Sequence, residues 1–385
     1  MEASGYRQLA PGEPAPWFRQ RTTAKPDYVF DTTGGRYIVL CFLGTARDAA
    51  GQAALGFAQE HRALFDDERC SFFGVTSDPD DAAAGRVVQS VPGIRHFLDF
   101  DGAVARLYGA LPEGAQPGDD AVTHQYRRIW VVLNPGLQVK AVLPFRPDGS
   151  DRQALATLLE GLPPVSHYGG LEMHAPVIII PDVLESALCE DLVRRYEAAG
   201  GTPSGFMRDV DGKTVALHDP GHKRRSDYTI EDDALRRLLQ HRVRQKVVPV
   251  IRKVHCFEAN RMERYLVGCY DAESGGHFAP HRDNTTRGTA HRRFALSVNL
   301  NDDFEGGELA FPEYGWRRYK VPAGGAIVFA GALLHTVSAV RRGRRYAFLP
   351  FLYDDAAAAE REANSAYLAG GGGYKAWPGG VPPRK

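Results

Sequence analysis

Two histidines and one aspartate in the C-terminal half of the chain could together bind a metal ion. His281 and Asp283 flank one arginine in the tripeptide HRD, and His335 follows farther along the chain. Residues i and i+2 of a β-strand point to the same face, so His281 and Asp283 can converge on one ion while Arg282 points away. Two imidazoles and one carboxylate on one side of a metal leave three adjacent coordination positions open. Non-haem Fe(II) enzymes that bind a co-substrate and O2 together use this arrangement.

An HxD tripeptide alone says little, because a turn histidine beside a solvated aspartate gives the same pattern. Its neighbours strengthen the metal interpretation: CYDAESGGHFAPHRD leads into it, and LNDDFEGGELAF and VPAGGAIVFAG separate it from His335. His277, which like His291 is near the motif, either lines a pocket or is a satisfied turn histidine. Asn299 and Asn301 either contact a co-substrate or serve a turn.

The segment from about residue 262 to residue 354 resembles the catalytic core of the prolyl-4-hydroxylase-like branch of the 2-oxoglutarate/Fe(II) oxygenases. The resemblance is carried by Tyr270, Gly276 and Phe278 before the HxD motif, and by the strand-turn-strand LNDDFEGGELAF. It continues through the strand PAGGAIVF and through HTVSAVRRGRR, which supplies the distal His, Val, Gly and Arg. All of these elements stand in the family's order.

The resemblance implies that His281, Asp283 and His335 hold Fe(II), which 2-oxoglutarate (2OG) chelates through its keto oxygen and C1 carboxylate. The far carboxylate of 2OG then needs a basic partner, which the family places two residues beyond a glycine. In this chain that residue is Arg345, after Gly343. A guanidinium can clamp a carboxylate with two hydrogen bonds.

Strand parity also supports Arg345, which is expected to share a strand face with the apolar Ala347, Leu349 and Phe351. Arg344 points the opposite way, and we expect it to be solvated. Tyr270 matches a tyrosine of the family that donates a hydrogen bond to the same carboxylate, and the alternative is a plain core tyrosine.

By resemblance, the expected reaction consumes O2 and 2OG, releases succinate and CO2, and hydroxylates an unactivated C–H bond, with ascorbate as a candidate reductant. The substrate is expected to be an amino-acyl side chain, with prolyl as one candidate, or a small polar molecule. The charged segment HDPGHKRRSDYTIEDD, residues 218–233, precedes the core. It is either a loop over a polar or peptide substrate or a solvated surface loop.

The pattern of residues 176–356 predicts a double-stranded β-helix, or jelly roll, with flanking helices. DVLESALCEDLVRRYEAAGG and DDALRRLLQHRVRQKVVPVIRKV indicate helices, and short strands separated by Gly, Pro and Asp turns follow them. Residues 357–385 are rich in Gly, Ala and Pro, and we expect a poorly ordered tail.

Residues 1–163 alternate apolar strands with amphipathic stretches, which predicts an α/β domain. LAPGEPAPWF, RYIVLCFLGTARDAAGQAALGF, SFFGVTSDPDD, FLDFDGAVARLYG and RRIWVVLNPG resemble the peroxiredoxin branch of the thioredoxin-like fold. That family's peroxidatic cysteine has no counterpart in GTARDAAGQAAL. Cys41 lies inside the preceding strand, where burial raises a thiol pKa. We therefore expect a non-catalytic domain for docking, dimerisation or substrate presentation, joined by a linker at 164–175.

The composition is that of a globular protein. The 385 residues are 43% hydrophobic and 24% charged, with a formal net charge of zero, which argues against general affinity for nucleic acid or acidic membranes. The first residues lack the pattern of a secretory signal, and the five cysteines lack metal-site spacing, so we expect a cytoplasmic protein. Expected partners are a small-molecule or peptide substrate and a second copy bound through the N-terminal domain.

Two other functions are compatible with parts of the pattern. One is a thiol-dependent peroxidase working through Cys41 or Cys70, with the jelly roll as a non-catalytic binding module. The other is a two-domain scaffold whose barrel binds a metabolite without turnover. Retention of a complete His-Asp-His set and of a basic residue at 345 argues against both alternatives.

Overall fold

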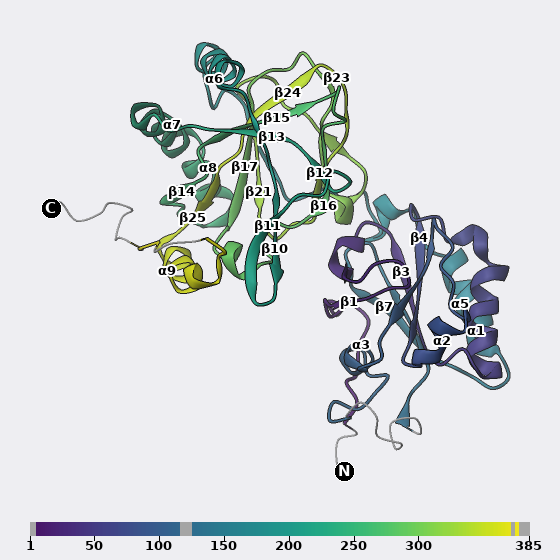
Figure 1. Ribbon diagram of the computed structural model, residues 1–385. Coiled ribbons are helices and arrows are strands. Elements are labelled where there is room, and N and C mark those ends of the chain that lie inside the picture. The colour runs from purple at the N-terminus through teal and green to yellow at the C-terminus, as the bar shows by residue number, and fades with distance from the viewer. Residues whose placement is uncertain (1–4, 116–124, 371–373, 377–385) are drawn as a thin grey trace. The chain divides into compact units, whose positions relative to one another are not determined.

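The computed structural model describes residues 5–115, 125–370 and 374–376, which fall into two compact units (Figure 1). Unit 1 comprises Met1–Ala175 with Pro312–Trp316, and unit 2 comprises Pro176–Phe311 with Arg317–Lys385. Each unit has its own apolar core. Within the described ranges, no helix combines the length and the apolar character needed to cross a membrane.

A mixed five-stranded sheet forms the centre of unit 1. Its order is β5 (Ile94–Leu98), β4 (Cys70–Thr76), β3 (Tyr37–Gly44), β6 (Ile129–Leu133) and β7 (Val139–Pro144). The strands β3, β4 and β5 are parallel, whereas β6 and β7 form an antiparallel hairpin around Asn134-Pro135-Gly136. A short pair, β1 (Arg19–Gln20) and β2 (Tyr28–Val29), stands apart from this sheet.

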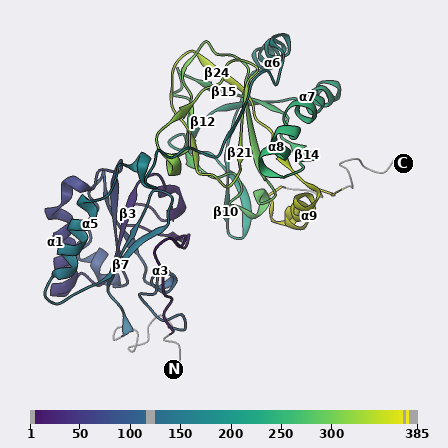
Figure 2. The same ribbon diagram turned by 180° about the vertical axis from the view of Figure 1, so that it is seen from behind.

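Helices cover both faces of this sheet, which is why β3 is apolar along its length. One face packs against α1 (Ala49–Glu60) and α5 (Ser150–Glu160), which lie side by side in Figure 2. The other packs against α3 (Ala103–Leu107), and a further short helix is α2 (Pro79–Ala83). The predicted α/β layering is confirmed, and the peroxiredoxin-like assignment stays a prediction.

The two thiols considered for peroxidase chemistry are sealed in this sheet. Cys41 in β3 has no exposed surface, and Cys70 begins β4 and is also buried. Burial raises the pKa of Cys41 well above its usual range and that of Cys70 to about 12. Neither sulfur is therefore a thiolate at neutral pH, as the sequence predicts for Cys41.

Unit 2 contains two antiparallel sheets, the arrangement of the predicted jelly roll. The large sheet runs β14 (Arg261–Glu263), β25 (Phe351–Tyr353), β17 (Phe294–Asn299), β24 (Arg344–Phe348), β15 (Leu266–Asp271), β13 (Ser226–Thr229) and β9 (Thr202–Pro203), with β21 (Ala326–Ala330) and β8 (Ile178–Ile180) joined to β17. The small sheet runs β12 (Lys223–Arg224), β16 (His277–His281), β22 (His335–Val337), β19 (Leu309–Ala310) and β20 (Arg318–Tyr319). Two separate pairs are β10 (Phe206–Val210) with β11 (Lys213–Leu217), and β18 (Glu305–Gly306) with β23 (Val340–Arg342).

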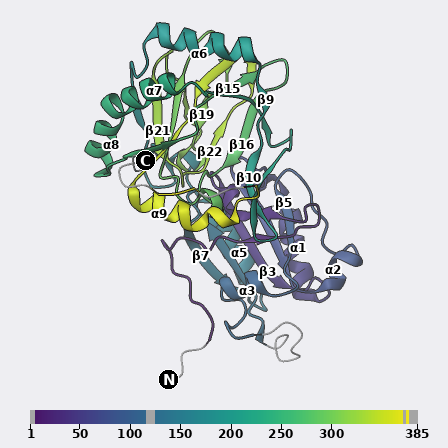
Figure 3. The same ribbon diagram turned by 60° about the vertical axis from the view of Figure 1, so that its left-hand side comes forward.

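Three helices pack together against the large sheet (Figure 3): α6 (Ser186–Ala199), α7 (Asp233–Lys246) and α8 (Val248–His255). Their buried Leu192 and Leu239 share one core with Val267 and Phe348 of the sheet. The sequence predicts α7 and α8 as one helix, but the structure divides them at Val247. Pro249, in the first turn of α8, has no N–H to continue the α7 ladder.

The expectation of an irregular tail from residue 357 is wrong for its first part. The helix α9 (Asp355–Asn364) begins there, and the Asp354 carboxylate caps it by accepting a hydrogen bond from the Ala357 backbone N–H at 2.9 Å. Ala357 and Ala358 are buried against Tyr353. Consecutive alanines strongly favour a helix, and the run of glycines begins only at Gly370, beyond the end of α9.

Candidate metal centre and its pocket

The structure brings the three predicted ligands together. His281 ends β16 and is the cross-strand partner of His335 in β22. Asp283 lies just beyond β16, and its two carboxylate oxygens lie 3.7 Å from His281 Nε2 and 3.4 Å from His335 Nε2. One donor atom from each residue falls within 4.8 Å of the others. Arg282 points elsewhere and donates to the Ala332 carbonyl at 2.6 Å.

Both histidines present the same ring nitrogen to this centre. The Nδ1 atoms of His281 and His335 lie 2.8 and 3.0 Å from the carbonyls of Ala279 and Leu333, so each Nδ1 carries the proton. Burial, followed by the neighbouring His335, lowers the pKa of His281 well below its usual range. A neutral imidazole is the form that binds a metal. Two neutral imidazoles and one carboxylate, without a thiolate, suit Fe(II).

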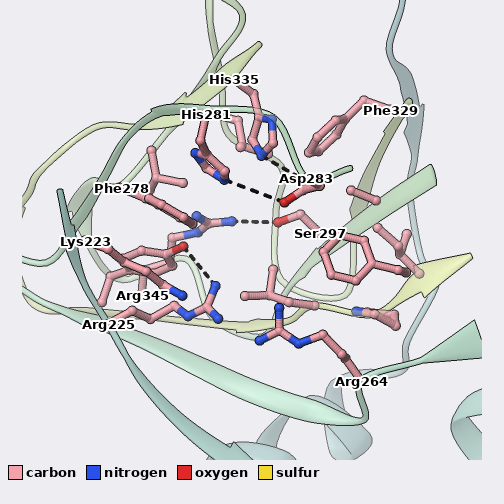
Figure 4. Close-up of a pocket in the computed structure, with 18 residues that line it drawn as sticks. Lys223, Arg225, Arg264, Phe278, His281, Asp283, Ser297, Phe329, His335 and Arg345 are labelled. Carbon is pink, nitrogen blue, oxygen red and sulfur yellow. Dashed lines mark hydrogen bonds and ion pairs between the residues drawn. The ribbon is translucent and has the colours of Figure 1, made fainter. Parts of the chain in front are cut away.

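The three residues border a pocket between the two sheets (Figure 4). The small sheet lines it with Phe278, His281, Leu309 and His335, and the large sheet lines it with Tyr270, Ser297, Phe329 and Arg345. Phe278 stacks on the His281 ring, and Phe329 lies against the His335 ring. The two phenyl rings therefore fix the orientation of both imidazoles and keep bulk water from one side of the metal centre.

Arg345 projects into the pocket from β24 and is 3% exposed. Its Nε donates to the Asn299 side-chain oxygen at 3.0 Å, and its Nη2 donates to Ser297 Oγ at 2.8 Å. Among the described residues, neither hydrogen-bond partner of this guanidinium is a carboxylate. A buried cation held by neutral oxygens is a fitting partner for the carboxylate of a small ligand. The parity prediction is confirmed, because the Arg344 side chain is 45% exposed.

The glycine pair in GGEL makes room for this arginine. Both Gly306 and Gly307 have positive φ angles, of 79° and 65°. A Cβ on Gly306 would lie 2.1 Å from the Ala339 carbonyl oxygen, and one on Gly307 would lie 3.1 Å from Arg345 Cδ. Larger residues here would push the turn away from Arg345, so the motif serves the pocket sterically.

Tyr270 shares the pocket with Arg345, in line with the prediction. Its side chain is buried, and the Arg345 guanidinium lies 5.5 Å from the centre of its ring. The Tyr270 hydroxyl accepts a hydrogen bond from Arg225 Nη1 at 3.4 Å. Because its oxygen is the acceptor in this contact, its own proton points elsewhere and can be donated to an anion in the pocket.

The sequence interpretation missed three cationic side chains that line the pocket: Lys223, Arg225 and Arg264. Arg225 pairs with Asp227 through two hydrogen bonds of 2.6 and 2.8 Å. Burial alone would raise the pKa of Asp227, but Arg225 outweighs it and holds that pKa at about 2. Lys223 donates to Ser204 Oγ at 2.8 Å and to the Gly205 carbonyl at 2.7 Å, and burial lowers its pKa to about 5.

The sequence contained a signal for two of these residues. Lys223, Arg225 and Asp227 alternate with Arg224 and Ser226, and such alternation places them on one face of an extended chain. The solvated-loop interpretation of residues 218–233 is therefore wrong for Lys223, which is 6% exposed. Arg264 carries no comparable signal, because it lies in an irregular position between β14 and β15.

Other candidates named from the sequence lie outside the pocket. Each ring nitrogen of His277 faces a backbone carbonyl, of Gly275 or Gly221, so this residue holds a turn. His291 is buried beside Glu263 at 3.0 Å. Asn301 serves a turn, accepting from the Tyr346 backbone N–H at 2.9 Å, whereas its neighbour Asn299 supports Arg345.

Comparison with known proteins links this part of the chain to one family. Residues 265–353 match the model of the 2OG-Fe(II) oxygenase superfamily. A PKHD-type hydroxylase of Pseudomonas fluorescens (strain Pf0-1) is 43% identical over 91 residues, which are 21% of this chain and 39% of that protein. The PKHD-type hydroxylase PiuC of Pseudomonas aeruginosa is 36% identical over the same shares of both chains. The chain thus spans about two fifths of the length of these curated relatives.

Solved structures similar to this chain include two prolyl hydroxylases. One is from Trichoplax adhaerens, in complex with a peptide fragment of the hypoxia inducible factor oxygen degradation domain. It has a TM-score of 0.40 and 17% identity, over 48% of this chain and 86% of that chain. The other is the viral collagen prolyl hydroxylase of Paramecium Bursaria Chlorella virus-1 in its 2OG complex. It has a TM-score of 0.34 and 18% identity, over 46% of this chain and 94% of that chain.

Proposed function

Residues 265–353 form a 2OG-Fe(II) oxygenase domain, and from this premise we propose that the protein is an Fe(II)- and 2OG-dependent dioxygenase. It hydroxylates an unactivated C–H bond of an amino-acyl side chain, with prolyl as one candidate, or of a small polar molecule. One observation carries the proposal: the His281-Asp283-His335 cluster and the buried, carboxylate-free Arg345 line the same pocket. This chemistry requires bound Fe(II) and bound 2OG. A metal-binding set and an anion-binding set in one cavity can hold the metal and the far carboxylate of 2OG, respectively.

Iron bound with 2OG supplies the oxidation of a C–H bond by O2, with 2OG leaving as succinate and CO2. The protein binds and orients these groups. His281, Asp283 and His335 hold the metal through Nε2, carboxylate and Nε2. Arg345 and the Tyr270 hydroxyl bind the far carboxylate of 2OG, and Ser297 and Asn299 fix the Arg345 guanidinium. Phe278, Phe329 and the neighbouring apolar side chains exclude water.

Unit 1 has a non-catalytic role in this proposal: docking, dimerisation or presentation of the substrate to unit 2. The buried, protonated state of Cys41 and Cys70 supports this assignment over a thiol-dependent peroxidase. At the N-terminus of α1, Asp48 caps the helix and pairs with Arg128 at 2.5 Å, so a carboxylate lies where peroxidase chemistry would need a thiolate.

The test is succinate release from 2OG by the full-length protein with Fe(II), with and without ascorbate, over peptides, free amino acids and small metabolites. We expect turnover in the wild type and none in His281→Ala or Asp283→Ala. His277→Ala is the matched control, because it removes a nearby histidine that holds only a turn. Undiminished succinate release in both ligand variants, or loss of bound iron in His277→Ala alone, would contradict the site assignment.

A further inference from the structure

The positive charges of the pocket exceed what the metal and 2OG neutralise. Under the proposed function, the charge of Fe(II) is balanced by Asp283 and the C1 carboxylate of 2OG, and Arg345 is balanced by the other carboxylate. Asp227 balances Arg225, to which it makes two short hydrogen bonds. Arg264 is then left over, lining the same pocket. The one carboxylate in contact with Arg264, that of Asp227, is already paired with Arg225, so the pocket is one negative charge short and can accept a further anion.

Arg264 is only weakly partnered within the protein. Its Nη2 lies 3.4 Å from Asp227 Oδ2, an oxygen that already accepts from Arg225 at 2.8 Å. Across the described parts of the chain, this is the one hydrogen-bond acceptor of its guanidinium, which offers five N–H donors. A further contact is with an aromatic face, since the guanidinium lies 5.6 Å from the centre of the Phe351 ring. Most of its donors therefore remain available to a ligand.

Arg264 is also more accessible than the neighbouring Arg225. Its side chain is 30% exposed, whereas that of Arg225 is 5% exposed. In Figure 4 the Arg264 guanidinium points into the cavity from the side opposite His281, Asp283 and His335. A molecule that spans the cavity from the metal ligands would meet this guanidinium, whereas the Arg345 side chain is almost fully buried.

The backbone at this position is strained. Arg264 has a φ of +64°, in the left-handed region that a side chain with a Cβ rarely adopts. Residues in strained conformations of this kind are concentrated at functional sites. The left-handed conformation ends the extended backbone between β14 and β15. The Arg264 side chain therefore faces the pocket and does not lie along a strand face.

We propose that the primary substrate carries a carboxylate and that Arg264 is the specificity-determining residue that binds it. The inference rests on the proposed function, since it assigns the substrate class of the same pocket. Two N–H groups of the guanidinium bind the carboxylate in the bidentate geometry, which holds the substrate's C–H bond toward the metal. Lys223 lines the same cavity, but its amine donates to Ser204 and Gly205, which leaves Arg264 as the donor for the substrate.

The test compares acids with neutral amides that otherwise have the same structure. N-acetylproline and N-acetylleucine are matched with their methylamides, and each is added to full-length protein loaded with Mn(II) and saturating 2OG. Paramagnetic broadening of the acetyl methyl NMR signal reports binding near the metal without any turnover. We expect broadening by the acids at concentrations about ten- to a hundredfold below those needed for the amides, as for a lost charged hydrogen bond.

Arg264→Gln should remove this difference between acids and amides, and Arg264→Lys should retain part of it because the charge remains without the planar fork. Arg344→Gln is the matched control, since that arginine is 45% exposed, pairs with Asp271 at 2.8 Å and does not line the pocket. Thermal unfolding of each variant checks that it is folded. If a variant does not fold, the preference of the wild type for acids still decides the question.

Equal broadening by acids and amides, or by neither, would overturn the inference. So would an acid that is displaced by excess 2OG, because its carboxylate would then occupy the Arg345 site. The proposed function is judged separately, by succinate release from the Fe(II)-loaded wild type. Succinate release without a preference for acids rejects only the role of Arg264, and absence of succinate release rejects the proposed function itself.

Discussion

Tyr270 and Arg345 are direct cross-strand partners in the ladder between β15 and β24, and both side chains enter the same pocket. The pairing brings the Arg345 guanidinium to 5.5 Å from the centre of the Tyr270 ring. The Tyr270 hydroxyl and the guanidinium can therefore approach one carboxylate together, although 74 intervening residues separate them in sequence. The register of two strands thus creates the end of the pocket that we propose binds the far carboxylate of 2OG.

Loss of Arg345 should weaken 2OG binding more than loss of the Tyr270 hydroxyl. We expect Arg345→Gln to raise the KM for 2OG at least about a hundredfold, because a buried charge-assisted pair is lost. Tyr270→Phe removes one neutral hydrogen bond and should raise the KM for 2OG about two- to tenfold. Succinate formation measured against 2OG concentration separates the two. Equal KM values for wild type and Arg345→Gln would rule out this role for Arg345.

The Arg225–Asp227 pair should matter for stability as well as for the pocket. Arg225→Met leaves the Asp227 carboxylate buried without its main partner, which costs about 3 kcal/mol of unfolding free energy. Arg264 remains within 3.4 Å of Asp227, so the loss should fall at the lower end of the range for a broken buried pair. Urea unfolding of unit 2 measures this loss. The double variant Arg225→Met/Asp227→Leu should recover most of it, and no recovery would show that the charge is not the cause.

Asp227 should also make folding sensitive to acid. Its pKa of about 2 in the folded protein lies below the usual 3.8, so the unfolded chain binds the proton more readily. The stabilisation, about 2 kcal/mol, is complete above pH 4 and is lost as the pH falls from about 4 to 2. The difference in unfolding free energy between wild type and Asp227→Asn, measured at pH 5 and pH 3, should shrink at the lower pH. A constant difference would contradict the assignment.

The native protein should contain one rapidly reacting thiol. Cys41, Cys70, Cys189 and Cys269 are buried, whereas Cys256 at the end of α8 is exposed. Ellman's reagent should therefore show one fast equivalent, which Cys256→Ser abolishes and Cys41→Ser leaves intact. The protein should also consume no peroxide with thiol reductants. Fast labelling of Cys41 or Cys70 without unfolding would reopen the peroxidase alternative.

Sequence pattern predicted those parts of the site that depend on local periodicity. The inward direction of Arg345 follows from strand parity with Ala347, and the structure confirms it. The parity argument for His281 and Asp283 is correct in its result but not in its detail. Asp283 lies past the end of β16, and its backbone N–H donates to the Gly331 carbonyl at 2.8 Å. A turn rather than a strand thus positions this carboxylate.

The residues that were missed depend on contacts between distant segments. Lys223 reaches the pocket because β12 pairs with β16, Lys223 opposite Phe278, and no local pattern specifies that pairing. Arg264 reaches it through a left-handed backbone conformation, which propensity rules assign to glycine or asparagine rather than arginine. Long-range register and local strain are the two kinds of information that composition and periodicity do not contain.

Three of the pocket's cationic side chains lie on segments separate from those that carry the predicted metal ligands and Arg345. Lys223 and Arg225 come from the β12–β13 segment and Arg264 from the bend after β14, whereas the predicted metal ligands and Arg345 come from β16, β22 and β24 and the turn after β16. Under the proposals above, mutation can change which molecule is accepted while the oxidising machinery is kept. A descendant gene, or a laboratory library randomised at positions 223 and 264, could therefore acquire new substrates by few substitutions.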